Sequence, residues 1–285
     1  MMKNIKVITP EQGSFLEHMN PIKIIFVMLG YRELIRQIVL RELRTRFRSG
    51  YLGPMWAFIN PLIQVGIYWF VFTTIFHSRW STPGTGSIHS ALMLFSGLIA
   101  FNIFSDIINR SPSLIVTNKN LVKKVVFPLE ILNIGLVAGA FVQSIVSIIV
   151  LLLIELLSYG SIPWTVMLVP VVYIPVILFS LGASWLIALL GVYIPDISNV
   201  VRIVMQFLFF LSAVFYPISA VPEAFRWAFE INPIAQAVEG LRDILVLGET
   251  GSINLMLLLA IVSGILILIS YSIFVSVEKT FGDYV

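Results

Sequence analysis

Residues 41–62 read RELRTRFRSGYLGPMWAFINPL, and this stretch joins a cluster of cations to a long apolar segment. Four arginines fall within eight positions: Arg41, Arg44, Arg46 and Arg48. Gly50 and Gly53 then interrupt the pattern. Pro54 is suited to the first turn of a new helix, where proline is tolerated. The stretch therefore predicts a boundary at which a basic segment ends and an apolar helix begins.

The composition outside this stretch is that of a chain surrounded by lipid. Apolar residues make up 58% of the 285 residues and charged residues 12%, whereas soluble domains average roughly 45–50% and about 25%. Several apolar runs reach the roughly 20 residues that cross a bilayer as a helix. They are continuous, whereas membrane strands alternate. The sequence predicts an all-α polytopic membrane protein.

Six spans are expected, at about 55–77, 91–109, 131–157, 164–193, 198–216 and 253–277. Lysines and arginines gather before the first span and after the second, whereas Arg79, Arg226 and Arg242 fall on the other side. Basic flanks mark the cytoplasmic side, so both termini are predicted to be cytoplasmic. The net charge of +3 is too small to suggest binding to nucleic acid, and without cysteine the chain forms no disulfide.

The segment before the first span, YRELIRQIVLRELRTRFR, has a helical period. Its apolar face consists of Tyr31, Leu34, Ile35, Ile38, Val39, Leu43 and Phe47. Basic residues fill the opposite face, so residues 31–50 are predicted to form an amphipathic interface helix that lies on the membrane surface and contacts lipid headgroups. The alternative is an anchor that only orients the first span.

The segment between the fifth and sixth spans carries too many charges to cross lipid and too many apolar residues for a solvated loop. Pro222 and Pro233 each stand where a short helix can begin. Two short helices that dip into the outer leaflet and return would fit this pattern. An amphipathic lid on the headgroups is the alternative.

Small residues and isolated acids mark two further features inside the spans. Gly135 and Gly139, in IGLVAGA, permit close approach of another helix. That contact is expected within the chain, although a subunit interface is possible. Asp106 and Glu155 are the acids nearest to mid-span, and each is expected to reach towards water or to pair with a neighbouring helix.

Motifs of catalysis are missing from the sequence. The dipeptide Gly-Lys does not occur, so the chain has no phosphate loop of its own. His18, His77 and His89 are scattered without metal-ligand spacing. We therefore expect no enzyme, no metal and no cofactor in this chain. If nucleotide drives the protein, another chain must hydrolyse it.

The order of these features resembles the permease subunit of bacterial ABC transporters that export O-antigens, capsules and teichoic acids. The matching residues begin with Arg44, Arg46, Phe47, Leu52, Gly53, Trp56 and Pro61. They continue with Phe127, Pro128, Glu130 and Asp196, and end with Tyr216, Pro217, Pro222, Asn232, Pro233 and Arg242.

The resemblance implies a homodimeric pore in the bacterial inner membrane, two copies of a separate ATPase that binds ATP and magnesium, and a lipid-linked polysaccharide as cargo. O-antigen is favoured over teichoic acid or capsule. It divides the chain into a cytoplasmic segment 1–30, an interface helix 31–50 and a permease domain 51–285. The last six matching residues, Tyr216, Pro217, Pro222, Asn232, Pro233 and Arg242, would form an outer gate hairpin.

Contact with that ATPase is expected at the two largest cytoplasmic features, which combine cations with apolar residues. The residues concerned are Arg41, Arg44, Arg46, Arg48, Asn118, Lys119, Lys123 and Lys124. A rigid helix in the headgroup plane could pass a push from below into the first span, which follows after a short turn.

Aromatic residues recur along three spans and could line the cargo path. They are Tyr68, Trp69, Phe72 and Phe76 on the first span, Phe101 and Phe104 on the second, and Phe207 and Phe210 on the fifth. Sugar rings stack their C–H faces on such side chains, and a smooth aromatic wall would let a polymer slide. The alternative is that these residues belong to the interfacial belt or pack between helices.

Two rival functions stay open at the level of sequence. A drug- or lipid-exporting ABC permease would share the fold but would favour an aliphatic channel wall. A membrane-embedded enzyme of lipid-linked glycan assembly would need a pair of catalytic carboxylates or a metal site, and the sequence offers no motif for either.

Overall fold

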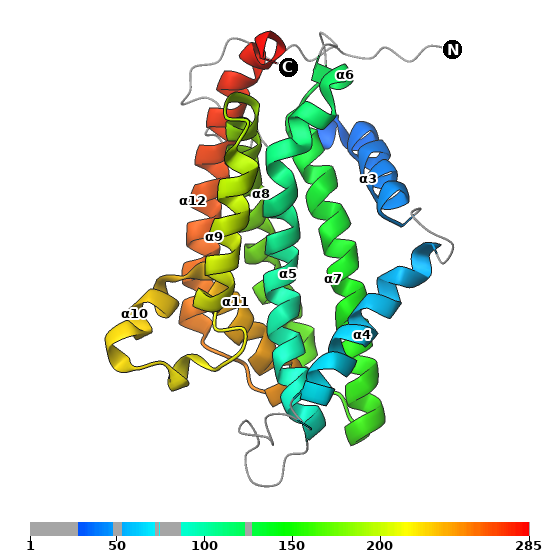
Figure 1. Cartoon of the computed structure of the whole chain (residues 1–285), viewed down its shortest axis with the longest axis vertical. Helices are drawn as coiled ribbons and strands as arrows, with labels where there is room; N and C mark the ends of the chain where they lie inside the picture. Colours follow the sequence, from blue (N-terminus) through cyan, green and yellow to red (C-terminus); the bar gives the residue numbers. More distant parts are fainter. Residues whose placement is uncertain (1–27, 48–52, 72–73, 75–86, 123–126, 285) are drawn as a thin grey trace.

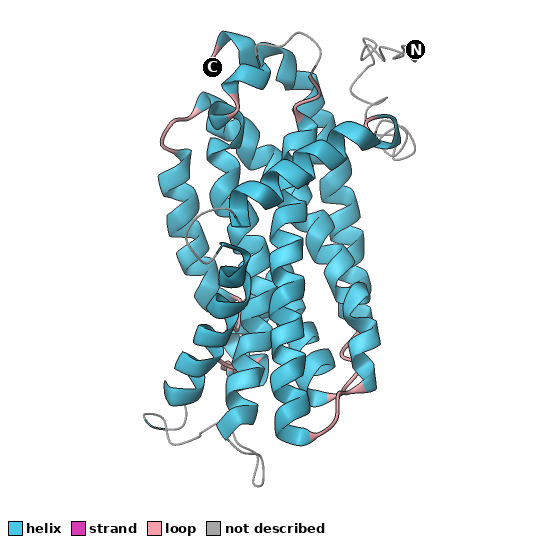
Figure 2. Ribbon diagram, turned by 90° about the vertical axis from the view of Figure 1, so that its right-hand side faces the viewer, coloured by secondary structure: helices cyan, strands magenta, loops and turns pink. Residues whose placement is uncertain are grey.

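A computed structural model describes residues 28–47, 53–71, 74, 87–122 and 127–284. Every regular element among these residues is a helix (Figures 1 and 2). The helices form an elongated bundle, in which the longest ones run side by side along the long axis. The predicted all-α class is therefore confirmed.

Four helices are long and apolar enough to cross a membrane. They are α5 (Ser87–Thr117), α7 (Glu130–Tyr159), α8 (Val169–Tyr193), which follows the 3-10 turn η3 (Trp164–Leu168), and α12 (Ile253–Val277). Helix α8 packs against both α5 and α12 and so occupies the centre of the bundle. These four agree with the predicted second, third, fourth and sixth spans.

Two shorter helices stand where the first and fifth spans were expected. The 3-10 turn η1 (Gly53–Met55) leads into α4 (Trp56–Phe70), and α9 (Ile197–Leu211) packs against α5 and α8. Each of the two has 15 residues. Helix α9 ends before the predicted limit of 216, because the backbone turns at Ala213, whose φ is +52°.

The centre of the bundle combines large apolar side chains with a short polar chain. Trp185 of α8 is fully buried and its ring nitrogen donates to the Glu130 carbonyl at 3.1 Å. The Asn133 amide of α7 donates to Ser184 Oγ at 2.6 Å, and Ser111 of α5 donates to the same oxygen at 2.9 Å. Hydrogen bonds between helices in an apolar interior fix their register, because an unpaired polar group there is costly.

The two ends of the bundle carry different elements (Figure 1). One end has α3 (Arg32–Phe47), α6 (Lys119–Val122) and the C-terminal η6 (Glu278–Asp283). The other end has η4 (Ile218–Ala220), α10 (Glu223–Ile231), α11 (Pro233–Arg242) and the π-turn η5 (Asp243–Leu247). The interface helix and the hairpin predicted from the sequence therefore lie at opposite ends.

Candidate functional site

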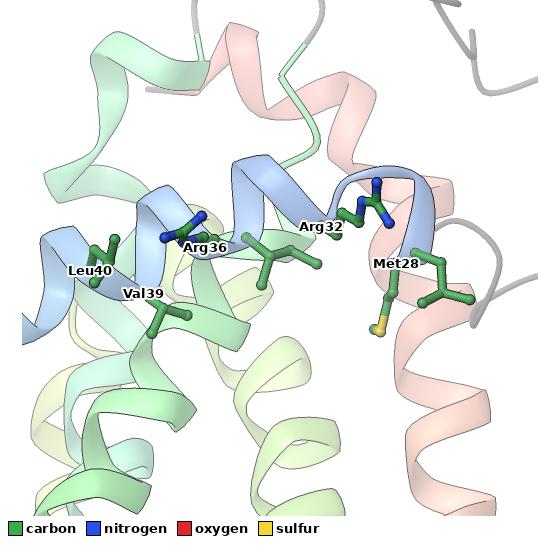
Figure 3. Close-up of a pocket in the computed structure, with 7 residues that line it drawn as sticks. Met28, Arg32, Arg36, Val39 and Leu40 are labelled. Atoms are coloured by element: carbon green, nitrogen blue, oxygen red, sulfur yellow. The ribbon is translucent and has the colours of Figure 1, made fainter.

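Helix α3 crosses the end of the bundle instead of running along it (Figures 2 and 3). Ile38 is buried in the core, and Tyr31, Leu34 and Ile35 pack against that core. In Figure 3 the side chain of Val39 points towards the bundle, while the Arg32 guanidinium points away from it. A hollow of about 430 Å³ lies along the N-terminal half of this helix. The apolar face of α3 therefore packs against the membrane-spanning helices.

Two glycines of α7 let α3 come close. A Cβ added at Gly135 would lie 2.5 Å from Ile38 Cγ2, and one at Gly139 would lie 2.9 Å from Glu42 Cγ. Ile38 and Glu42 are four residues apart, as the glycines are, so one turn of α3 fits over one turn of α7. The close helix approach predicted at this motif is thus made within the chain, by α3.

Ion pairs fix α3 to α5 on the same side. Arg46 pairs with Asp106, the mid-span acid of α5, and donates a second hydrogen bond to the Gly139 carbonyl of α7 at 2.8 Å. Arg110 of α5 pairs with Glu42 at 2.5 Å. Asp106 therefore pairs with a neighbouring helix, one of the two outcomes expected from the sequence. Arg46 is turned into the bundle, although the basic face was expected to point away from it.

The structure also brings together the two predicted ATPase-contact features. The Arg41 guanidinium donates to the Asn118 side-chain oxygen at 2.9 Å, which joins α3 to the end of α5 just before α6. Arg44 and Lys119 are exposed at this end. Arg48, Lys123 and Lys124 lie outside the described residues. An exposed basic surface thus sits on a helix that is held rigidly to two spans.

The hairpin at the opposite end has one exposed helix and one buried helix. Helix α10 exposes large apolar side chains such as Phe225 and Trp227. Helix α11 packs against α5, α8 and α12 and buries seven of its ten residues. Asn232 stands between them, where its side chain accepts from the Ile234 N–H at 3.0 Å and donates to the Leu211 carbonyl at 3.0 Å. Helix α11 therefore packs among the long helices, and the choice between a re-entrant hairpin and a surface lid stays a prediction.

Arg242 holds the buried helix of the hairpin in place. Its side chain is 1% exposed and pairs with Glu239. It also donates to the carbonyls of Ala213 and Val214, both at 3.1 Å, and to that of Met93 at 3.3 Å. These bonds join α11 to the end of α9 and to the beginning of α5. Burial lowers the pKa of the guanidinium, and the neighbouring carboxylates oppose this effect.

The other predicted gate residues shape the turn that leads into the hairpin. The Tyr216 hydroxyl donates to the Phe210 carbonyl at 2.6 Å, and its ring contacts Phe229 edge-on at 6.0 Å. Pro217 and Pro222 stand immediately before η4 and α10, and Pro233 opens α11. Asp243 follows Arg242 in the chain, and its pKa is raised to about 6. Burial is the main cause, and the charges of Glu239 and Glu249 add to it.

The aromatic residues proposed for the cargo path fall into three environments. Phe101 and Phe104 of α5 are buried, with Phe104 against Phe179. Tyr68 is half-buried. The remaining described members are exposed: Trp69, Phe207 and Phe210. Phe72 and Phe76 lie outside the described residues.

One aromatic contact was missed by the sequence reasoning. Phe101 meets Phe209 of α9, with ring centroids 5.0 Å apart. Phe209 lies between the two members chosen on that helix, and the helical spacing gave no reason to prefer it.

A bundle of apolar membrane-length helices, with a charged helix tied across one end, defines a polytopic membrane protein. The chain belongs to the ABC-2 type transporter family, whose sequence model matches residues 33–246. Similar proteins cover almost its whole length. The O-antigen export system permease protein RfbA of Myxococcus xanthus is 27% identical over 265 residues, which is 92% of this chain and 99% of that protein.

Two further relatives are also named for the transport of a polysaccharide. The protein of that name from Klebsiella pneumoniae is 26% identical over 258 residues, which is 90% of this chain and 96% of its own length. The polysialic acid transport protein KpsM of Escherichia coli is 28% identical over 239 residues, or 80% of this chain and 88% of that protein.

Proposed function

We propose that this chain is the permease subunit of an ATP-driven exporter of lipid-linked polysaccharide in the bacterial inner membrane. It would move its cargo from the cytoplasmic to the outer face, with O-antigen as the first candidate. One observation carries this proposal: the chain aligns nearly end to end with permeases named for O-antigen export. The relative named for polysialic acid transport aligns over a shorter part and makes capsule the second candidate.

The power source in this proposal is a separate ATPase, present in two copies, that binds ATP and magnesium beneath a dimer of this chain. The exposed Arg44 and Lys119 would meet it at the end of the bundle that carries α3. Because Glu42 and Arg46 tie α3 to α5, a push on α3 would reach a membrane-spanning helix directly. Both termini are cytoplasmic in this arrangement, and Arg41 and Asn118 keep the two contact features together.

The opposite end would hold the outer gate. Helix α11 is buried among the spans and is the fixed part of the hairpin, whereas helix α10 is exposed at the surface. The predicted aromatic residues would guide sugars along the pore between the two ends. In this arrangement Arg242 sets the position of the gate, and Tyr68, Trp69, Phe72, Phe76, Phe101, Phe104, Phe207 and Phe210 would supply the channel wall.

Deletion of the gene, followed by analysis of surface and intracellular glycan, tests the proposal. A permease defect should remove the surface polysaccharide while complete lipid-linked chains accumulate in the cytoplasm, and a plasmid copy should restore export. A membrane enzyme of glycan assembly would instead leave no complete lipid-linked chain anywhere. Normal surface glycan in the deletion strain would contradict the proposal and would favour a drug or lipid as cargo.

A further inference from the structure

A groove of about 380 Å³ runs between α5 and α9. The two helices are antiparallel, so its lining changes in order from the α3 end towards the hairpin end (Figure 1). From the order of residues along the two helices we infer three levels: Asn109 level with Arg202, then Ser105 level with Gln206, then Phe101, whose ring meets that of Phe209. The groove therefore has a cationic end, a middle in which Ser105 and Gln206 stand beside the apolar Met205, and an aromatic end.

Arg202 is the cation that lines this groove, and it has no acidic partner among the described residues. Helix α9 begins at Ile197, so Arg202 stands about 7.5 Å along it at roughly 1.5 Å per residue. Its side chain is exposed in the groove and donates to Asn199 Oδ1 at 2.5 Å. It forms no ion pair with any residue that the structure describes, whereas Arg46, Arg110 and Arg242 each have one. An exposed guanidinium on an otherwise apolar helix is available to an anionic ligand.

The neutral polar side chains below Arg202 add a second kind of recognition. Asn109 and Gln206 are exposed and Ser105 is half-buried, although each stands on an apolar helix. Amides and hydroxyls both donate and accept hydrogen bonds, as sugar hydroxyls do. The Phe101 and Phe209 rings at the far end offer an apolar surface. A phospholipid headgroup offers the arginine the same phosphate but no sugar ring, so the two kinds of ligand differ at the polar side chains.

We propose that this groove binds the sugar phosphate at the lipid-attached end of the exported glycan. Arg202 contacts the phosphate, because guanidinium groups form strong charge-assisted hydrogen bonds with phosphate oxygens. Ser105, Asn109 and Gln206 contact the hydroxyls of the first sugar. This inference rests on the proposed function, and it assigns to Arg202 a role beyond that of orienting the chain in the membrane.

Binding to the full-length chain in phosphatidylcholine nanodiscs tests the site, with radiolabelled farnesyl diphosphoglucose as probe. The wild-type protein should bind the probe, and Arg202→Gln should weaken binding about tenfold or more, the loss expected from one charge-assisted contact. Arg202→Lys should keep part of the affinity. Arg226→Gln, an equal change at the hairpin end, should have no effect. Farnesyl glucoside, which lacks phosphate, should not displace the probe.

Two results would overturn the inference. In one, Arg202→Gln binds the probe as tightly as the wild type does. In the other, phosphatidylglycerol displaces the probe as well as unlabelled farnesyl diphosphoglucose does, which would mean a site for bulk lipid. If Arg202→Gln does not yield a folded protein, Asn109→Leu at an exposed position replaces it. We then expect a smaller loss, of about two- to tenfold, because a neutral hydrogen bond is removed, and unchanged binding would again contradict the inference.

Export measured in cells separates this inference from the proposed function. If the deletion strain lacks surface glycan and Arg202→Gln restores it fully, only the phosphate site is wrong. If the deletion strain keeps its surface glycan, the proposed function itself is wrong, whatever the binding assay gives.

Discussion

Arg46 differs from its neighbours on α3 because its guanidinium is turned into the bundle. It bridges α5 and α7 through Asp106 and the Gly139 carbonyl, while Arg44, half a turn away, is exposed. Two arginines in one short motif therefore have different tasks. Arg46 holds the helix in place, and Arg44 is available to a partner.

Charge reversal separates these two tasks. Arg46→Glu would place a carboxylate against Asp106, and we expect a loss of about 1.5–3 kcal/mol in the free energy of unfolding, as for a hydrogen bond to a charged group. Thermal unfolding of the purified protein measures this loss. Arg44→Glu serves as the matched control and should unfold like the wild type but lose stimulation of the partner ATPase. Equal stability of both variants would contradict the assignment.

The glycine contact predicts a second effect at the residue scale. Gly135→Ala should push α3 off α7, because the new methyl group would meet Ile38, and overpacking of this kind costs about 1–3 kcal/mol. In an Ile38→Ala background the same Gly135→Ala change should cost much less, because the side chain that the methyl group meets is gone. Gly264→Ala on α12, where no atom lies within 4 Å of the added carbon, is the control and should not destabilise the protein. A Gly135→Ala protein with unchanged thermal unfolding would show that α3 is loosely held.

The sequence predicted the interface helix and its apolar face, because the helical spacing of apolar residues can be read from a short continuous segment. It could not predict which helix would use Gly135 and Gly139, since small residues show only that some helix comes close. The pairing of Arg46 with Asp106 could not be predicted from the sequence either. The two residues are 60 positions apart and meet only because α3 folds back across the bundle.

At the scale of elements, the hairpin depends on one buried arginine. Arg242 satisfies carbonyls at the end of α9 and at the beginning of α5, so α11 cannot shift without leaving them unpaired. The sequence could predict the two short helices from their prolines. It counted Arg242 as an outer flanking charge, since nothing in the local pattern shows that this side chain is buried.

Substitution of Arg242 should therefore lower the stability of the protein strongly. Arg242→Met keeps the apolar stem but removes the donors and leaves Glu239 without its cation, so we expect a loss of about 3–5 kcal/mol. Arg242→Lys should recover only part of it, because a single ammonium cannot reach all the carbonyls. Arg226→Met on exposed α10 is the control and should cost much less. Thermal unfolding in detergent distinguishes the two arginines, and equal losses would contradict the role of Arg242.

At the scale of the whole molecule, the two ends should face opposite sides of the membrane. The chain has no cysteine, so single cysteines can be introduced without further changes. We expect Glu230→Cys on α10 to react with an impermeant maleimide in intact cells, and Gln37→Cys on α3 to react only after permeabilisation. Both positions are exposed. Labelling of both in intact cells would show that the termini are not cytoplasmic.

The limits of the spans were harder to predict than their existence. Hydropathy identifies apolar runs well, and all four long helices agree with expected spans. The end of α9 was placed five residues too late, at 216 instead of 211, because the five residues after Leu211 carry no charge, proline or glycine that would end a span. The turn at Ala213 depends instead on the hydrogen bonds from Arg242, which come from another part of the chain.

The early end of α9 leaves this helix shorter than a bilayer is thick. Fifteen residues rise only about 22 Å, whereas the hydrocarbon layer is roughly 30 Å thick. Lipids beside this helix must shorten or tilt their tails to match it, at a cost of fractions of a kcal/mol per Å. We therefore expect the activity of this protein to depend on the acyl-chain length of the bilayer that surrounds it.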